Sequence, residues 1–461
     1  MKVTLNINSY SVKWMLYLSV AVIYAVAQIN VLMYLIILVQ LFCCVKAFLE
    51  REKKYTEECI DLILISLIMP DNYCVIFISL LVFFFAEREI RMSVNAAVLI
   101  MISLAYVFWG ILMNGVRIPN IFMSLVYMLP FRLQESSARN LFQKKNELVS
   151  YLCRSIKKVI LIEILATVVY ALTHMNIVAK YADMDWVTGT LGAYQCNVLM
   201  FICSISILLL WAECEKGKKS NILWIALGGA LVVATGAVAY TLIFSLAIIV
   251  IMLFDLKIPA KMKLGVLLCL VVAGTLFVLV VPDWMVGDII KMTDKNYLVN
   301  RVAKLKYYQN TFVEMPRNEG AVFFLFGTGI GQYSSRAAAT CAGGYIGGYD
   351  RFFSAFETVF REKYISAFDF GEGILALPYA SIMSLQGEVG FFGLAAVLTY
   401  FIHKFMRAGS RTGKIAIVYF VGLMFIENTL EFAKYGALLW IVYYACQRKN
   451  DHLMMNPNKS V

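Results

Sequence analysis

The sequence has few charged residues for its length. Asp, Glu, Lys and Arg make up 15% of its 461 residues, whereas a soluble domain of this size carries about 25%. Hydrophobic residues reach 61%, and the mean hydropathy is +0.75. The low charge argues against an ordinary soluble protein. The chain also lacks the apolar–polar alternation of a membrane barrel, so we expect an all-α polytopic membrane protein.

Clusters of cysteine and histidine with metal-ligand spacing are also lacking. The eleven cysteines have no CxxC pair, and most lie in or beside apolar runs, where a cysteine acts as a small hydrophobe. The three histidines, His174, His403 and His452, are far apart in the chain. Cys341 is the only cysteine of the long loop described below. We therefore expect no metal, no cofactor and no disulfide within that loop.

Apolar runs dominate what is present, and a run of about 20 residues suffices to span a bilayer. They predict 12 to 14 transmembrane helices, in three blocks. Residues 1–281 hold the first eleven, 282–372 form one large polar loop, 373–446 hold three more, and 447–461 form a cytoplasmic tail. The fourteen runs fall near 14–28, 31–48, 59–70, 73–86, 94–113, 119–130, 159–174, 192–212, 221–234, 237–254, 264–281, 386–403, 414–429 and 435–446.

The basic residues indicate an orientation for these runs. With a cytoplasmic N-terminus, the predicted inner segments hold 28 of the 41 Lys and Arg residues, as the positive-inside rule requires. Ten of the remaining 13 lie in the long loop, and only Arg117, Lys180 and Lys434 lie in other outer segments. This pattern predicts a multi-pass protein of a plasma membrane with the long loop on the extracytoplasmic face. It also explains most of the net charge of +11 without nucleic acid.

The loop contains a predicted amphipathic helix from Tyr297 to Val313. Leu298, Val302, Leu305 and Phe312 fall on one stripe, and Arg317 would lie in the turn after the helix. The polar residues Arg301, Lys304, Lys306 and Tyr308 flank that stripe. Such a helix can lie in the headgroup region with its cations toward phosphate, either as a plain anchor or as part of a catalytic site.

Glycines and a few polar residues complete the candidates. Gly327, Gly329 and Gly331 alternate, a pattern that suits a turn or close approach to a ligand. Asn197 and Gln195 lie in an apolar run, where polar groups are functional suspects. Glu427 and Glu431 lie near an outer helix end, and Glu431 has the spacing to pair with Lys434 at the surface.

Three segments together resemble the bacterial O-antigen polymerase (Wzy-type) and ligase family. They are Gly189–Asn197 at a helix entry, Asn300–Leu305 followed by Leu325–Tyr333 in the loop, and Ser384–Leu394 at the start of the next helix. Their order and spacing fit the family over residues 185 to 405. The chain departs from the family pattern in lacking a tryptophan soon after Arg301. It also lacks a histidine ahead of Glu388, where Pro378 and Tyr379 stand.

The resemblance implies a metal-independent glycosyltransferase that joins polyprenyl-diphosphate-linked oligosaccharide units outside a bacterial inner membrane. A diphosphate is a competent leaving group, so cations on it matter most, and the arginine fork suits phosphate oxygens. We expect Arg301 to bind the diphosphate. Glu388 is our candidate base, although capping its helix is the simpler role, and Asp283, Asp288, Asp369 and Glu372 compete with it. The expected substrate-binding residues are Arg117, Asn197, Lys304, Lys306, Tyr308, Gly327, Gly329, Gly331 and Arg336.

The expected partners are the lipid-linked donor and acceptor, the membrane and a chain-length regulator protein, with no nucleic acid. An O-antigen ligase, which differs mainly in its acceptor, and a polysaccharide flippase are the alternatives. A flippase should carry charges spread through its helices, whereas here they cluster at helix ends. A lipid-phosphate-sugar transferase of the other membrane architecture would want acidic residues in the first external loop, which is only about residues 28 to 30.

Overall fold

Every regular element in the described part of the computed structural model is helical. The structure describes residues 9–50, 54–86, 94–115, 118–143, 147–174, 188–191, 195–215, 217–255, 303–342, 358–366 and 380–447, with isolated positions between 259 and 275. Helices coincide with thirteen of the fourteen predicted apolar runs, and the run 264–281 lies almost wholly outside the described residues. The helices outside the long loop are α1 Ser9–Ala27, α2 Asn30–Leu49, α3 Tyr55–Leu67, α4 Asn72–Ala86, α5 Val94–Asn114, α6 Ile118–Gln143, α7 Glu147–Thr173, α9 Cys196–Glu215, α10 Asn221–Ala234, α11 Val238–Phe254, α21 Ser381–Arg407, α22 Arg411–Leu423 and α23 Ala433–Gln447.

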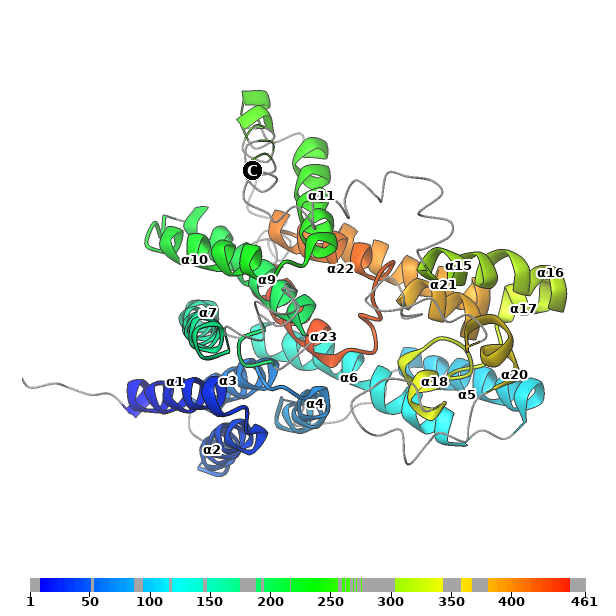
Figure 1. The fold of residues 1–461 in the computed structure, drawn as a ribbon, viewed down its shortest axis with the longest axis horizontal. Helices are drawn as coiled ribbons and strands as arrows, with labels where there is room; N and C mark the ends of the chain where they lie inside the picture. The colour runs from blue at the N-terminus through cyan, green and yellow to red at the C-terminus, as the bar shows by residue number, and fades with distance from the viewer. Residues whose placement is uncertain are drawn as a thin grey trace, which may run out of the picture.

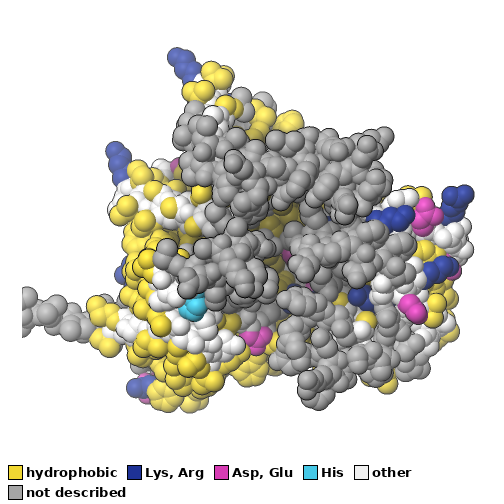
Figure 2. Space-filling model, in the orientation of Figure 1, with side chains coloured by type: hydrophobic (Ala, Val, Ile, Leu, Met, Phe, Trp, Pro, Cys, Tyr) yellow, Lys and Arg dark blue, Asp and Glu magenta, His cyan; other side chains and the backbone are white. Residues whose placement is uncertain are grey.

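Three of these helices are long and apolar enough to cross a membrane, namely α2, α9 and α21. Five shorter apolar helices, of 10 to 17 residues, accompany them within the described residues. Large apolar side chains also lie exposed on outward helix faces, as with Phe42 on α2 and Leu223 on α10. Figure 2 shows hydrophobic side chains along the margin formed by α1, α2 and α10, while charged side chains gather over the loop elements. Such a surface is compatible with a protein that sits in lipid.

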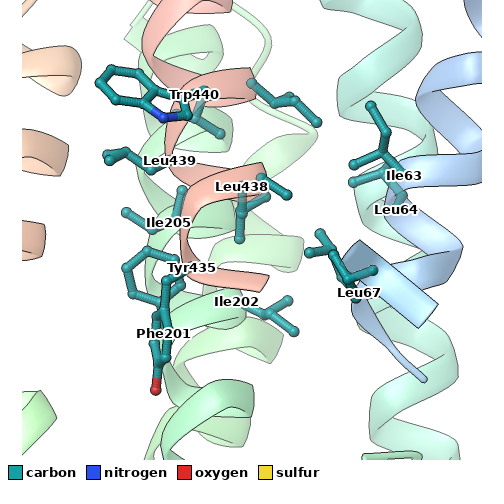
Figure 3. Close-up of a cluster of buried hydrophobic side chains, with 14 of the residues drawn as sticks. Ile63, Leu64, Leu67, Phe201, Ile202, Ile205, Tyr435, Leu438, Leu439 and Trp440 are labelled. Carbon is teal, nitrogen blue, oxygen red and sulfur yellow. The ribbon is translucent and has the colours of Figure 1, made fainter. Parts of the chain in front are cut away.

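The core of the bundle is built around α9 and α23. Both helices bury nearly every side chain, which is what a helix that is apolar on all sides requires. Figure 3 shows Phe201, Ile202 and Ile205 of α9 against Tyr435 and the leucines of α23, with Ile63, Leu64 and Leu67 of α3 alongside. The remaining helices surround this centre (Figure 1). The two central helices therefore fix the positions of the residues at their ends.

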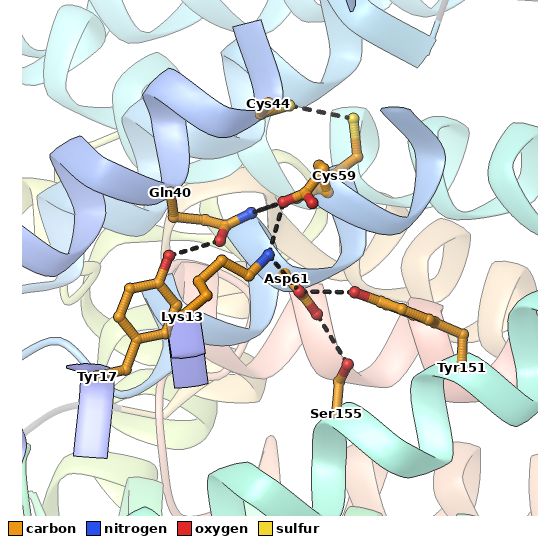
Figure 4. A network of polar contacts seen from close by, with 9 residues as sticks. Lys13, Tyr17, Gln40, Cys44, Cys59, Asp61, Tyr151 and Ser155 are labelled. Atoms are coloured by element: carbon orange, nitrogen blue, oxygen red, sulfur yellow. Dashed lines mark hydrogen bonds and ion pairs between the residues drawn. The ribbon is translucent and has the colours of Figure 1, made fainter. Parts of the chain in front are cut away.

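A buried polar network joins α1, α2, α3 and α7 (Figure 4). The Lys13 ammonium lies 2.7 Å from the Glu58 carboxylate and 2.9 Å from the Asp61 carboxylate. Tyr151 and Ser155 also donate to Asp61, at 2.7 and 2.8 Å. Because both oxygens of Asp61 are occupied, this network is satisfied and serves to hold the four helices together.

The predicted loop helix is confirmed in its described part, but its end and the outward placement of Lys304 were predicted wrongly. Helical backbone runs from α15 (Ala303–Gln309) through a π-helical turn, Asn310–Glu314, into α16 (Met315–Glu319). Arg317 therefore lies within the helix rather than in a turn after it. Leu305, on the predicted apolar stripe, is 46% exposed, whereas Lys304, expected to direct its cation toward phosphate, is 4% exposed. The helix turns the side that carries Lys304 and Tyr308 toward the bundle, because both residues donate hydrogen bonds to backbone carbonyls there, as described below.

The rest of the described loop consists of short helices that return to the bundle. They are α17 (Ala321–Phe326), α18 (Arg336–Cys341) and α20 (Val359–Arg361), the last followed by a π-helical turn at Glu362–Ser366. In Figure 1 they lie together with α5 and the start of α21 at one end of the molecule. Between α17 and α18 the chain has no regular structure from Gly327 to Ser335, and we call this stretch the glycine segment.

Candidate functional site

The Glu388 side chain of α21 holds the glycine segment in place. It is buried, with 3% of its surface exposed. One carboxylate oxygen accepts the Gly331 N–H at 2.7 Å, and the other accepts the N–H groups of Tyr333 and Ser335, each at 3.1 Å. Because three backbone N–H groups engage both carboxylate oxygens, little acceptor capacity is left to take a proton from a substrate hydroxyl. The geometry therefore favours a positioning role for Glu388 over the predicted role as base.

An interruption of α21 supplies two further acceptors to the glycine segment. Gly390 has φ +65°, which breaks the regular helix, and the Gly387 and Glu388 carbonyls turn to the segment. They accept the N–H groups of Thr328 and Gly329, each at 2.8 Å. Irregular backbone inside a membrane bundle is tolerated only when its polar groups are satisfied by protein in this way. The segment is thus built into the bundle rather than laid over it.

Side chains of α5 and α6 donate hydrogen bonds to carbonyls of the glycine segment. Trp109 donates its indole N–H to the Gly327 carbonyl at 2.9 Å, and Asn114 donates to the Thr328 carbonyl at 2.7 Å. Asn120 donates to the Gly331 carbonyl at 2.8 Å. These three donors stand more than 200 positions earlier in the chain, so the segment joins the first half of the bundle to the second.

The glycines are needed for this close approach. At Gly329, with φ +109°, a Cβ would lie 2.3 Å from the Gly110 Cα, and at Gly331 it would lie 2.4 Å from the Ser124 Oγ. At Gly327 it would lie 2.4 Å from the Glu388 carbonyl carbon. The N–H groups of all three glycines are donated within the protein. The three glycines therefore position the segment. They were predicted to contact a ligand, but in this arrangement none of their N–H groups is free to donate to one.

The glycine segment delivers Arg336 to a site between two aromatic rings. Ser335 caps α18 by accepting the Ala338 N–H, so Arg336 is the first residue of that helix. Its guanidinium carbon lies 4.5 Å from the centroid of the Phe432 ring and 5.8 Å from that of Tyr127. Its Nε is buried and has no hydrogen-bond partner, and no carboxylate of the described residues forms an ion pair with it. This guanidinium is therefore held in place with capacity left for an anion.

Glu431 and Lys434 lie beside Arg336, and sequence reasoning misjudged both. Each is 0% exposed, whereas a pair at the surface was predicted. Glu431 accepts the Arg336 backbone N–H at 2.5 Å and a bond from the Asn428 amide. Lys434 donates to the Met69 carbonyl at 2.5 Å and to Gln195 at 2.8 Å. The signal available in the sequence was an acidic residue, Glu431, at the end of an apolar run. We call Arg336, Asn428, Glu431, Lys434 and Gln195 the junction.

The loop helix fastens onto the turn that carries Glu431. Lys304 donates to the Ile426 carbonyl, and the Tyr308 hydroxyl donates to the Phe425 carbonyl at 2.8 Å. Burial lowers the pKa of Lys304 to about 8 and raises that of Tyr308. Both residues were predicted to face substrate, but the described contacts of their polar atoms are to this turn. The loop helix thereby supports the junction from the side of the 424–432 turn.

The other predicted residues divide into described and undescribed ones. Asn197 lies in the first turn of α9, two residues after Gln195, and is partly exposed. Lys306 is partly exposed on α15. Arg301 and Arg117 lie outside the described residues, so the structure neither places them at the junction nor separates them from it. Asp283, Asp288, Asp369 and Glu372 lie outside them as well. The described residues contain no group of three or more potential metal ligands.

Comparisons with known proteins identify no relative of this chain. No family model, no curated protein and no solved structure matches the chain. The function must therefore be argued from the residues and their arrangement.

Proposed function

We propose that this chain is an oligosaccharide repeat unit polymerase of a bacterial inner membrane. It would join polyprenyl-diphosphate-linked oligosaccharide units into a surface polysaccharide, on the outer face and without a metal or cofactor. Support comes from the three ordered segments that resemble the Wzy-type family and from the helical bundle with one large late loop. Two of those segments, the glycine segment and the start of α21, lie against each other through Glu388.

The observation that carries the proposal is the site of Arg336. A diphosphate leaving group needs cation density as the glycosidic bond breaks. Arg336 offers a guanidinium held over Phe432 and Tyr127 and free of ion pairs with the described residues. A guanidinium can meet two phosphate oxygens at once. Among the described residues, Arg336 is thus our candidate for the diphosphate site. Arg301 and Arg117 remain predictions for the same role.

Orientation supports an outer location for the site. In the predicted topology, the ends of α3 and α22 and the starts of α9, α21 and α23 face outward, and the junction lies among them. The inner ends carry the basic residues, as the positive-inside rule requires. A lipid diphosphate in the outer leaflet would lie at the same level as these helix ends.

Substituting Arg336 tests the proposal. Purified protein is assayed for extension of a lipid-diphosphate-linked unit in excess chelator, with Arg336→Ala, Arg336→Lys and Arg301→Ala. Loss of one transition-state contact costs about a hundredfold in rate, and we expect lysine to restore little, because a point charge lacks the fork. Arg317→Ala, at an exposed position on α16, is the matched control and should keep full activity. Near wild-type extension by folded Arg336→Ala would remove Arg336 from the site.

The chelator makes this assay a test of metal independence as well. The sequence holds an Asp-x-Asp pair, Asp183 and Asp185, outside the described residues. Extension that stops with chelator and returns with magnesium or manganese would show that the reaction needs a metal.

The glycan profile of cells that lack the protein separates the alternatives. A polymerase defect leaves single units on the carrier's normal endpoint, but no polymer. A defect in a ligase or a flippase removes every unit from that endpoint. The second pattern would contradict the proposed function.

A further inference from the structure

Glu431 has a carboxylate oxygen that nothing else in the described structure uses. Its Oε2 accepts the Arg336 N–H and the Asn428 amide, whereas its Oε1 is buried and has no partner. Glu388, by contrast, uses both of its oxygens on backbone N–H groups. A buried polar atom without a partner is costly and needs an explanation. Glu431 is therefore the carboxylate of this site with acceptor capacity to spare.

Glu431 and Arg336 lie next to each other, and the charge of the Arg336 guanidinium acts on the Glu431 carboxylate. Phe432, which follows Glu431 in the chain, carries the Arg336 guanidinium on its ring face. Glu431 also binds the backbone N–H of Arg336 directly, at 2.5 Å. One small region thus combines a proton acceptor with an anion-binding group. Glycosyl transfer from a diphosphate needs both functions.

We propose that Glu431 is the base of the transfer reaction, an inference that rests on the proposed function. The acceptor hydroxyl oxygen forms a bond to the anomeric carbon of the donor glycan. The bond from that carbon to the diphosphate oxygen breaks, and the diphosphate leaves with the electron pair. The hydroxyl proton moves to the free oxygen of Glu431. Arg336 takes up the charge on the diphosphate.

The charges around Glu431 are consistent with this role. It lies in the turn between α22 and α23, outside both helices. Burial, and then the Glu388 carboxylate of α21, raise the pKa of Glu431 to about 8, while Arg336 at the start of α18 and the Asn428 amide oppose the rise. A base works best when its pKa lies near the working pH. The ionised fraction then falls tenfold for each pH unit below about 8.

The test is a pH–rate profile of purified protein that extends a lipid-diphosphate-linked unit. Wild-type turnover should rise about tenfold per pH unit up to about pH 8. Glu431→Gln should lose a hundredfold or more, as expected when a general base is removed, yet still bind polyprenyl diphosphate. Glu431→Asp should keep measurable turnover. Glu427→Gln, in the same turn, is the matched control and should keep the wild-type rate and profile.

Each of the other outcomes overturns the inference. Turnover by Glu431→Gln within a few-fold of wild type, a wild-type profile that is flat from pH 6 to 8, or equal loss of turnover and lipid binding would each exclude a base. If Glu431→Gln does not fold, the pH–rate profile of Asn428→Ala tests the inference instead. Removing a donor to the carboxylate should shift the profile to higher pH, and an unmoved profile rejects the base. A wild-type protein that never extends the lipid-linked unit rejects the proposed function itself.

Discussion

Replacing Glu388 separates a positioning residue from a base. Glu388→Ala leaves three buried N–H groups unpaired, those of Gly331, Tyr333 and Ser335. Each unpaired group costs about 1–3 kcal/mol, so the variant should lose about 3–9 kcal/mol. Native proteins are stable by only about 5–15 kcal/mol. We therefore expect Glu388→Ala to express poorly or to unfold.

Glu388→Gln gives a graded test of the same idea. An amide oxygen can replace the carboxylate oxygen that serves Tyr333 and Ser335, but the amide nitrogen then faces the Gly331 N–H, donor against donor. The loss should be about 1–3 kcal/mol. Glu50→Ala is the control. It breaks an ion pair with Lys46 at the exposed end of α2, which is worth about 0–1 kcal/mol.

The assay is reversible unfolding of purified protein in mixed micelles, with activity measured on the same samples. The expected order of stability is wild type and Glu50→Ala together, then Glu388→Gln, then Glu388→Ala. A Glu388→Gln protein with wild-type stability and no activity would refute the positioning role. It would return Glu388 to the role of base that the sequence suggested.

Three further predictions concern packing, pH and orientation. Gly329→Ala should destabilise by about 2–5 kcal/mol, because left-handed strain adds about 1–2 kcal/mol to an overpacking cost of about 1–3. Gly217→Ala, at φ +96° with nothing within 4 Å, should show only the strain, and equal losses would disprove the clash with Gly110. The folded-state pKa of Lys304, about 8, lies below its ordinary value of 10.5, so the unfolded chain binds more protons between these values. The stability of wild type relative to Lys304→Met should therefore rise from pH 8 to 10.5 in unfolding measurements, and a constant difference would contradict the lowered pKa. A cysteine at Asn318 should react with an impermeant thiol reagent outside intact cells and one at Gly409 should not, while the reverse result would invert the topology.

The positions of the helices were predictable because long apolar runs in the sequence favour helices. Every described run, from α1 to α23, became a helix. The face of the loop helix was not predictable in this way. The pattern placed the polar flank of the helix toward phosphate, but Tyr308 and Lys304 donate to the carbonyls of Phe425 and Ile426 of the bundle instead. Those acceptors lie more than 100 residues away in the chain, and no local pattern reveals them.

The candidate site was predictable in residue type but not in role. Glu388, which was expected at the start of its helix and lies inside α21, and the glycines of the loop were both identified, and the structure joins them. The sequence does not show that this contact uses all the acceptor capacity of Glu388. The spacing of Glu431 and Lys434 suggested a surface pair, because i to i+3 neighbours meet on one helix face. Instead a helix start at Ala433 separates them, and each finds its own buried partners.

The bonds from α5 and α6 to the glycine segment also set an order of events during synthesis. Trp109 and Asn114 are separated from their carbonyl partners by 218 and 214 positions. At about 5–20 residues per second, the ribosome needs roughly 10–40 s to supply those partners. During that interval, two polar side chains of the first half await acceptors that have not yet been made. This part of the bundle is therefore completed only when the glycine segment arrives and α21 enters the bundle behind it.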